Sequence, residues 1–294
     1  MSFPLASEDF YRFKIGRFDC ISVSDGCYDY DVAHLFPGIS EEQLKEALEK
    51  SPMVSGKLRS PYTFLYVDTG RQKILIDMGA GKLGPHTGRL KSNLEAAGVR
   101  ASEINTIIIT HAHPDHIGGT LDENGNPNYP GARYFIWKDE WDFWFSDEAY
   151  HKVVEHYSTI LQPEVFMKTA RGQLGPVKDR IEMITEEAEI MPGVRVFHTP
   201  GHTPGHMAVA FSSEGEELVF VGDAIVFPFL IEQPEIVPVF DIIPEQADQT
   251  KRKLCDQLAE RQSWVLAQHF WPFPSLGHII RKGDAWQWKP VVIP

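Results

Sequence analysis

The chain of 294 residues is 43% hydrophobic and 23% charged, which is typical of a globular protein with a sizeable core. Its 41 acidic residues outnumber its 28 basic residues, and the formal charge of -13 opposes long-range attraction to nucleic acid or to an anionic membrane surface. No apolar run approaches about 18 residues and no basic start precedes an apolar segment, so we expect a cytoplasmic protein without membrane or nucleic-acid partners.

Regular elements are predicted along most of the chain. Strands are expected where apolar residues alternate or β-branched residues cluster, at 13–15, 20–23, 64–67, 73–76, 107–109, 134–137, 193–197, 207–211, 218–221 and 264–268. Helices are expected where apolar residues recur on one helical face, at 41–50, 90–97, 140–161 and 245–261. Ser24-Asp25-Gly26 predicts a turn. Asp77, directly after a strand, either caps a glycine turn or orients a ligand histidine.

The densest chemical motif follows the isoleucine strand at 107–109. His111, His113, Asp115 and His116 place four potential metal ligands within six residues. Side chains two residues apart in an extended segment project to the same side, so His111 and His113 face one position. Asp115 and His116 are turned toward a second position. This density favours a metal site over a solvated turn, and the arrangement predicts a cradle for two ions.

A second histidine-rich loop follows the strand at 193–197 and reads His-Thr-Pro-Gly-His-Thr-Pro-Gly-His from His198 to His206. Two Pro-Gly turns restrict this loop, and His202 at its centre is predicted to be a ligand with little conformational freedom. His198 and His206 flank the loop on its strands, so we expect them to support the site or the fold.

Two further strand ends carry ligand candidates. Asp223 follows the apolar strand at 218–221 after a glycine, and its two carboxylate oxygens are suited to bridging two ions. His269 directly follows the strand at 264–268, whereas His278 begins a strand of its own. Position at a strand end favours His269 as the last ligand, with His278 as the alternative.

Aromatic residues are concentrated in the helix expected over 140–161. Such a stripe is usually part of a core, but a lid above the metals, a substrate wall and a dimer interface are alternatives that the pattern leaves open. Five aromatic residues are candidates for the wall of a substrate pocket: Trp141, Trp144, Phe227, Phe229 and Trp271.

These motifs resemble those of the metallo-β-lactamase-fold hydrolases. The resemblance is carried by His-x-His-x-Asp-His at 111–116, Thr-Pro-Gly-His at 199–202, Gly222-Asp223 and the late histidine at a strand end. Within the superfamily, the chain is most similar to the branch of methyl parathion hydrolase and quorum-quenching N-acyl-homoserine lactonases. The segments that suggest this branch are Leu83-Gly84-Pro85, Glu140-Trp141, Gln233-Pro234-Glu235 and the ending from Phe273 to Trp288.

The resemblance implies an α+β fold, a four-layer αββα sandwich of two mixed β-sheets flanked by helices. It also implies a ligand set for two divalent ions. One ion would be held by His111, His113 and His202, the other by Asp115, His116 and His269, and both by the bridging Asp223. Because the ligand candidates run from 111 to 269 or 278, we expect a single domain over 1–294.

Zinc is the expected metal on these nitrogen and carboxylate ligands, with manganese, iron or cobalt as alternatives. Two ions would lower the pKa of a bridging water toward neutrality, so that a hydroxide serves as the nucleophile. Asp115 or Asp223 would accept the proton.

The function implied is that of a dinuclear metal-dependent hydrolase of a small, fairly apolar lactone, ester or phosphotriester, with a homodimer as the expected assembly. Two alternatives share the fold: a metal-binding protein without hydrolytic turnover, such as a sensor or docking module, and a phosphodiesterase. Asp223 argues against β-lactam hydrolysis as the main role, since β-lactamases of this fold usually have cysteine or serine at that place.

Overall fold

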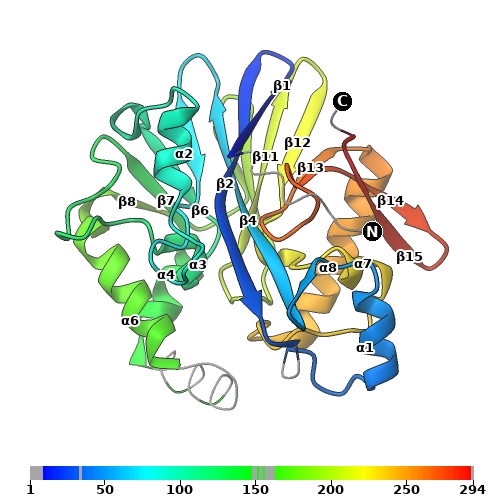
Figure 1. Cartoon of the computed structure of the whole chain (residues 1–294). Coiled ribbons are helices and arrows are strands. Elements are labelled where there is room, and N and C mark those ends of the chain that lie inside the picture. The colour runs from blue at the N-terminus through cyan, green and yellow to red at the C-terminus, as the bar shows by residue number, and fades with distance from the viewer. Residues whose placement is uncertain (1–8, 33–34, 148–150, 152–154, 156–162, 293–294) are drawn as a thin grey trace.

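Two β-sheets pack face to face between outer layers of helices in the computed structural model, which describes residues 9–32, 35–147, 151, 155 and 163–292 (Figure 1). Both sheets are mixed, because each contains parallel as well as antiparallel neighbours. This architecture confirms the predicted four-layer α+β sandwich.

The first sheet has the strand order β1-β2-β4-β5-β6-β7-β8, with β3 paired to β4. Its strands are β1 (Phe10–Ile15), β2 (Phe18–Tyr30), β3 (Met53–Val54), β4 (Lys57–Asp68), β5 (Lys73–Ile76), β6 (Thr106–Ile109), β7 (Arg133–Trp137) and β8 (Ile181–Ile184). The second sheet has the order β15-β14-β13-β12-β11-β10-β9. Its strands are β9 (Ala188–Met191), β10 (Val194–His198), β11 (Met207–Ser213), β12 (Glu216–Phe220), β13 (Trp264–Leu266), β14 (Leu276–Lys282) and β15 (Ala285–Pro290).

Helices cover the outer faces of the two sheets (Figure 1). They are α1 (Glu41–Leu48), α2 (Leu90–Ala96), α3 (Pro114–Ile117), α4 (Lys138–Phe145), α6 (Pro163–Leu174), α7 (Phe229–Glu232) and α8 (Pro244–Arg261). The helices predicted at 41–50, 90–97 and 245–261 are confirmed as α1, α2 and α8. Among the described residues, no helix has both the length and the apolar character needed to cross a membrane.

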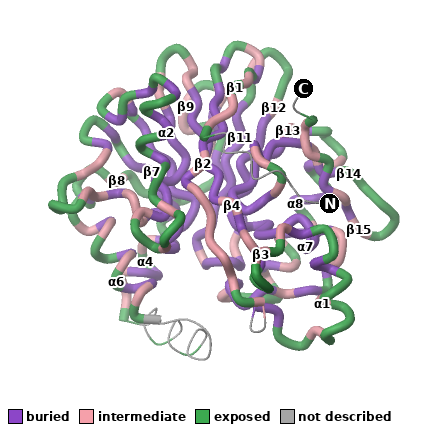
Figure 2. The backbone as a smooth tube through the Cα atoms, viewed as in Figure 1, coloured by how far each residue is buried: buried purple, intermediate pink, exposed green. Residues whose placement is uncertain are grey.

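The sequence of strand β6 is apolar without interruption because both faces of the strand are buried. Ile108 points into the core between the two sheets, whereas Ile107 and Ile109 point into the core beneath the helices. All three are fully buried because both faces of the sheet are covered, and Figure 2 shows the same burial along the central strands. The loop that follows β6 therefore starts from a strand that is packed against a core on each face.

Two predicted elements are wrong in their extent. The turn expected at 24–26 is a bulge, because β2 continues to Tyr30 while its pairing with β4 shifts register between Ser24 and Gly26. The helix expected over 140–161 is interrupted, because Ser146 has an extended conformation that ends α4. Residues 148–150, 152–154 and 156–162 of this prediction lie outside the described residues. Within α4, Trp144 is fully buried and belongs to the core beneath the helices.

Asp25 explains the bulge in β2. Its side chain is 1% exposed, and its carboxylate accepts hydrogen bonds from the backbone N–H of Ala80 at 2.9 Å and of Leu90 at 2.7 Å. A sequence that ordinarily signals a surface turn thus ties β2 to the segment between β5 and α2. Burial raises the pKa of Asp25 to about 6, although the backbone donors act in the opposite direction.

The buried Asp25 predicts a pH-dependent contribution to stability. Because its pKa is about 6 in the folded protein against an ordinary 3.8, the folded state binds this proton more tightly than the unfolded chain. The resulting stabilisation is complete below pH 3.8 and is lost as the pH rises through 6. We expect the free energy of unfolding of the wild type, relative to Asp25→Asn, to fall by about 1 kcal/mol between pH 5 and pH 7.5 in urea titrations. A difference that stays constant over this range would contradict the assignment.

Candidate metal centre

Four loops that follow strands β6, β10, β12 and β13 meet at one edge of the two sheets. They bring together all seven residues predicted as ligands: His111, His113, Asp115, His116, His202, Asp223 and His269. A backbone hydrogen bond of 3.0 Å from the N–H of Met207 to the carbonyl of Thr110 joins the loops of the two sheets. Residues separated by as many as 158 positions in the sequence (269 minus 111) are therefore neighbours here.

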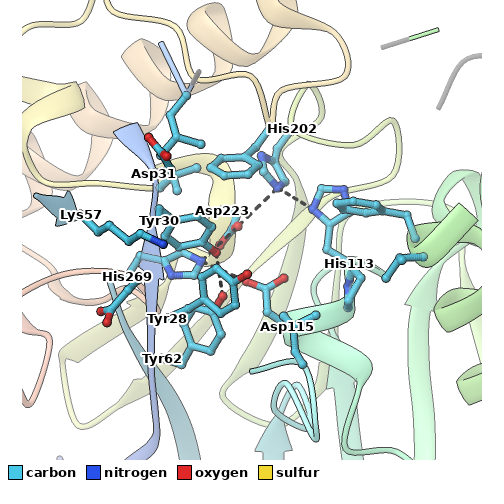
Figure 3. Close-up of a pocket in the computed structure, with 18 residues that line it drawn as sticks. Tyr28, Tyr30, Asp31, Lys57, Tyr62, His113, Asp115, His202, Asp223 and His269 are labelled. Carbon is cyan, nitrogen blue, oxygen red and sulfur yellow. Dashed lines mark hydrogen bonds and ion pairs between the residues drawn. The ribbon is translucent and has the colours of Figure 1, made fainter. Parts of the chain in front are cut away.

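The seven side chains form two overlapping groups. His111, His113, His202 and Asp223 make one, and Asp115, His116, His269 and Asp223 make the other. Within each group, one possible ligand atom per residue lies within 4.8 Å of the others. Asp223 belongs to both groups and lies between them, and Figure 3 shows it facing His202 and His269.

The carboxylate of Asp223 is the centre of this arrangement. Its Oδ1 lies 3.3 Å from Nε2 of His116, and its Oδ2 lies 3.3 Å from Nε2 of His202 and 3.4 Å from Nε2 of His269. Burial alone would raise the pKa of Asp223, but the adjacent His269 and His116 hold it well below its ordinary value. The carboxylate is therefore ionised and ringed by imidazole nitrogens.

Several atoms in the cluster lack the partners that buried polar groups require. Among the described residues, no hydrogen-bond partner is found for the buried Nε2 atoms of His111 and His116 or for Oδ1 of Asp223. Nδ1 of His113 and Nε2 of His202 lie 2.9 Å apart, so only one hydrogen fits between them. Inward-facing lone pairs of this kind are costly in a buried site unless an electrophile binds them. The nitrogen and carboxylate donors fit divalent transition-metal cations.

The electrostatic surroundings of the histidines fit a cation site. Burial, with the neighbouring imidazoles, holds the pKa of His111 and His113 well below the ordinary value, so both rings are neutral. Burial acts in the same direction at His116, but Asp223, Asp115 and Asp77 together raise its pKa well above the ordinary value. The three carboxylates thus favour positive charge at this place in the cluster.

The outward nitrogens of three histidines are fixed by polar partners. Nδ1 of His116 lies 2.7 Å from Oδ2 of Asp77, and Nδ1 of His202 lies 2.9 Å from Oδ1 of Asp241. Nδ1 of His269 lies 2.9 Å from the hydroxyl of Ser60 on β4. These contacts turn each Nε2 toward the centre. Asp77 therefore orients a histidine, one of its two predicted roles.

Asp241 and Ser60 also orient histidines of the cluster, and neither residue could be singled out from the sequence. Neither stands in a motif, and each is distant in the sequence from the histidine that it contacts, by 39 positions for Asp241 and 209 for Ser60. The one signal available for Asp241 is a carboxylate in an apolar stretch, which is weak without the fold.

The two histidines expected to play supporting roles, His198 and His206, lie outside the cluster, and so does His278, the alternative to His269 as the last ligand. His206 Nε2 accepts a hydrogen bond of 2.9 Å from the backbone N–H of Asp223, and its Nδ1 lies 2.8 Å from the hydroxyl of Thr199. His198 stacks on Trp137 with ring centroids 4.5 Å apart. His278 lies on β14, where its Nδ1 is 3.0 Å from the carbonyl of Ser263.

Gly222 explains how His206 reaches the backbone of Asp223. Its φ of 52° is a left-handed conformation, and a Cβ at this position would lie 2.7 Å from Nε2 of His206. Glycine therefore permits both the sharp turn after β12 and the hydrogen bond that orients Asp223.

Glu140 on α4 connects two of the ligand loops. Its Oε1 accepts hydrogen bonds from the backbone N–H of Ala112 at 2.8 Å and from Nε1 of Trp144 at 2.6 Å. Its Oε2 accepts from the hydroxyl of Thr203 at 2.5 Å and from the N–H of Gly205 at 3.1 Å. Burial raises the pKa of Glu140, and the four donors partly offset this effect. One carboxylate thus joins the loop of His111 and His113 to the loop of His202.

A cavity of about 460 Å³ opens onto the cluster. Its floor is formed by His113, Asp115, His202, Asp223 and His269, and its apolar walls by Tyr28, Tyr30, Leu35, Phe166, Val226 and Phe240. Among the described residues that line it, none is one of the five aromatic wall candidates, Trp141, Trp144, Phe227, Phe229 and Trp271. That prediction is wrong because these rings pack elsewhere. Phe227, for example, is fully buried behind His269.

Two tyrosines on the wall next to the cluster share a hydrogen bond. The hydroxyls of Tyr30 and Tyr62 lie 2.6 Å apart. Both tyrosines line the same cavity as Asp115 and Asp223, all four of which are labelled in Figure 3, and the charge of Asp115 acts on both phenols. Burial raises the pKa of each phenol well above its ordinary value, so both hydroxyls carry their hydrogen at neutral pH.

Comparison with known proteins identifies the family. The family model of the metallo-beta-lactamase superfamily matches residues 56–269, and the chain belongs to this superfamily. The matched segment contains all seven residues of the cluster.

Two solved structures are similar over nearly their whole length. The hydrolase AbOPH of the beta lactamase superfamily is 28% identical with a TM-score of 0.89, and AidC, a dizinc quorum-quenching lactonase solved with a product, is 26% identical with a TM-score of 0.90. Each comparison covers 97% of this chain and 98% of the other.

Among curated relatives, the atrochrysone carboxyl ACP thioesterase of Passalora fulva is 29% identical over 172 residues, which are 58% of this chain and 40% of the thioesterase. The matched part of the chain spans between 40% and 57% of the length of the first three curated relatives.

The contacts of Glu140 predict that it stabilises both the fold and the metal site. In Glu140→Gln an amide nitrogen replaces one acceptor oxygen, so two buried donors lose their partner. We expect the free energy of unfolding to fall by about 2–4 kcal/mol, measured by urea denaturation, and the affinity for Zn²⁺ to fall at least about tenfold. Asp139→Asn, at the exposed neighbouring position of α4, is the matched control and should change neither. Unchanged stability in Glu140→Gln would contradict the role.

Proposed function

We propose that the chain is a dinuclear metal-dependent hydrolase of a small, fairly apolar lactone or ester, with phosphotriesters as a related substrate class. The observation that carries this proposal is the pair of overlapping His/Asp groups at the floor of a largely apolar cavity. Since the residues of the site run from 111 to 269, we propose that the chain forms a single catalytic domain.

The proposed ligand set follows the two groups. His111, His113 and His202 would hold one ion, Asp115, His116 and His269 the second, and Asp223 both. Zinc is the first choice for these donors. When bound, two such ions would supply a hydroxide nucleophile at neutral pH and would polarise the carbonyl oxygen of the substrate.

The protein's own residues supply orientation and proton transfer. Asp115 and Asp223 both line the cavity, and Asp115 is the more exposed of the two, at 9% against 4%. Asp115 is therefore better placed to take the proton of the nucleophile and to return it to the leaving oxygen. The Nε2 of Gln268, 3.4 Å from Oδ2 of Asp115, helps to hold this carboxylate.

The apolar part of the cavity wall favours an acyl group with a hydrocarbon chain, and Asp29, Asp31 and Lys57 border the cavity as well. Leu35, Phe166, Val226 and Phe240 present apolar surface to the space above the floor. A hydrocarbon chain placed against them loses contact with water, which stabilises binding. The names of two relatives agree with this class, since one is a lactonase and the other an acyl-carrier thioesterase.

Metal removal tests the proposed function directly. We expect about two equivalents of metal per chain by elemental analysis and turnover of an acyl-homoserine lactone or an aryl ester. A chelator should abolish this turnover, and added Zn²⁺ should restore it. His113→Ala and Asp223→Ala should each lower kcat at least about 1000-fold. A metal-loaded protein that is inert toward lactones, esters, phosphotriesters, phosphodiesters and β-lactams would instead favour a sensor or docking role.

Replacing His269 and His278 one at a time tests which of them is the last metal ligand. His269→Ala should lose about one metal equivalent and most activity, because its Nε2 lies 3.4 Å from Asp223 and 3.5 Å from Asp115. His278→Ala should keep both metals, because this ring contacts Ser263 and Trp264. The metal content of the purified variants decides whether His269 or His278 is the ligand. Loss of metal in His278→Ala but not in His269→Ala would exclude the proposed ligand set.

A further inference from the structure

The hydroxyls of Tyr30 and Tyr62 form a pair that the proposed metal chemistry does not use. Tyr30 ends strand β2, and Tyr62 lies on the neighbouring strand β4. Both residues border the cavity, where Tyr30 is partly exposed and Tyr62 is fully buried. Figure 3 labels both together with Asp115 and Asp223.

The direction of the hydrogen bond between them follows from burial. The two hydroxyls carry two hydrogens, and only one hydrogen lies in the 2.6 Å contact. Tyr62 is fully buried, and among the described residues its hydroxyl has no hydrogen-bond partner other than Tyr30. Tyr62 therefore donates to Tyr30, because the reverse arrangement would leave its own hydrogen buried without an acceptor. The hydrogen of Tyr30 is left to point into the cavity.

The rings on both sides hold the hydroxyl pair in place. Tyr30 packs edge-on against Phe240 with ring centroids 5.5 Å apart, and its ring lies 4.8 Å from that of Tyr28. Tyr62 packs edge-on against His269 at 5.1 Å. A donor with a fixed position next to a reacting centre needs no reorganisation when charge develops, which is the condition for effective stabilisation of a transition state.

We propose that the hydroxyl of Tyr30 is a catalytic hydrogen-bond donor to the substrate oxygen that gains negative charge during attack, and that Tyr62 is the residue that positions it. The inference rests on the proposed hydrolysis for its catalytic part. No proton is transferred by Tyr30, which remains a phenol throughout.

Binding of an anion tests the donor without turnover. Hexanoate is a suitable probe, since its carboxylate oxygen resembles the charged oxygen and its chain suits the apolar walls. We expect zinc-loaded Tyr30→Phe to bind hexanoate at least about tenfold more weakly than the wild type in calorimetric titrations, because one hydrogen bond to a charged oxygen is lost. Tyr66→Phe is the matched control. Tyr66 lies four residues after Tyr62 on β4, is 3% exposed and does not line the cavity.

A double variant separates catalysis from stability. Tyr30→Phe leaves the hydroxyl of Tyr62 buried without a partner, so we expect a lower melting temperature. Tyr30→Phe/Tyr62→Phe removes both hydroxyls and should recover the melting temperature, yet its hexanoate affinity should stay as low as that of Tyr30→Phe. Tyr62→Phe alone should weaken binding about threefold, because the donor of Tyr30 remains but is less restricted.

Kinetics provide the second readout. On a lactone that the wild type hydrolyses, Tyr30→Phe should lower kcat about 100-fold with KM changed less than about threefold, as expected for a donor used mainly in the transition state. Equal hexanoate affinity of wild type and Tyr30→Phe, including no binding by either, would overturn the inference. Recovery of affinity in the double variant would also overturn it. A weaker Tyr30→Phe complex in a protein that hydrolyses no substrate would refute the proposed function and leave the donor role standing.

Discussion

Burial of charge at one edge of the molecule is the constraint on which the rest of the structure depends. Asp223 is 4% exposed, and three imidazole nitrogens lie within 3.4 Å of its carboxylate. A carboxylate at this depth costs several kcal/mol unless opposite charge and hydrogen bonds compensate it. The compensation comes from histidines whose outer nitrogens are tied to Asp77, Asp241 and Ser60, so that orientation is set by the fold before any cation binds.

The fold supplies this orientation by joining its two sheets at the site. The loop after β6 belongs to the first sheet, and the loop of His202 belongs to the second. Glu140 accepts hydrogen bonds from both loops, and the N–H of Met207 donates to the carbonyl of Thr110 across the same junction. A relative shift of the sheets would break these contacts together, which makes the geometry of the cluster a property of the whole sandwich.

The parts of the site that could be predicted from the sequence are those encoded locally. His111, His113, Asp115 and His116 lie within six residues at the end of an apolar strand, so their convergence follows from strand geometry alone. The roles of Asp241 and Glu140 could not be found in this way, because each residue acts on a loop that only tertiary packing brings near. The turn expected at Asp25 failed for the same reason, since distant backbone donors bury a residue that usually marks the surface. Pocket walls were mispredicted because aromatic content does not reveal which way a ring points.

The two sides of the cavity differ in how directly their wall residues are connected to the seven residues of the cluster. On one side, Val226 contributes to the wall only three residues after Asp223, so a change of its size is transmitted along a short loop to the central carboxylate. On the other side, Tyr28 reaches the cavity from β2, a strand that carries none of the seven cluster residues. A substitution at Tyr28 therefore alters the shape offered to a substrate while the cluster keeps its geometry and Tyr30 keeps its hydroxyl. Variation in substrate range at constant chemistry is expected to arise at Tyr28, and loss of chemistry on the side of Val226.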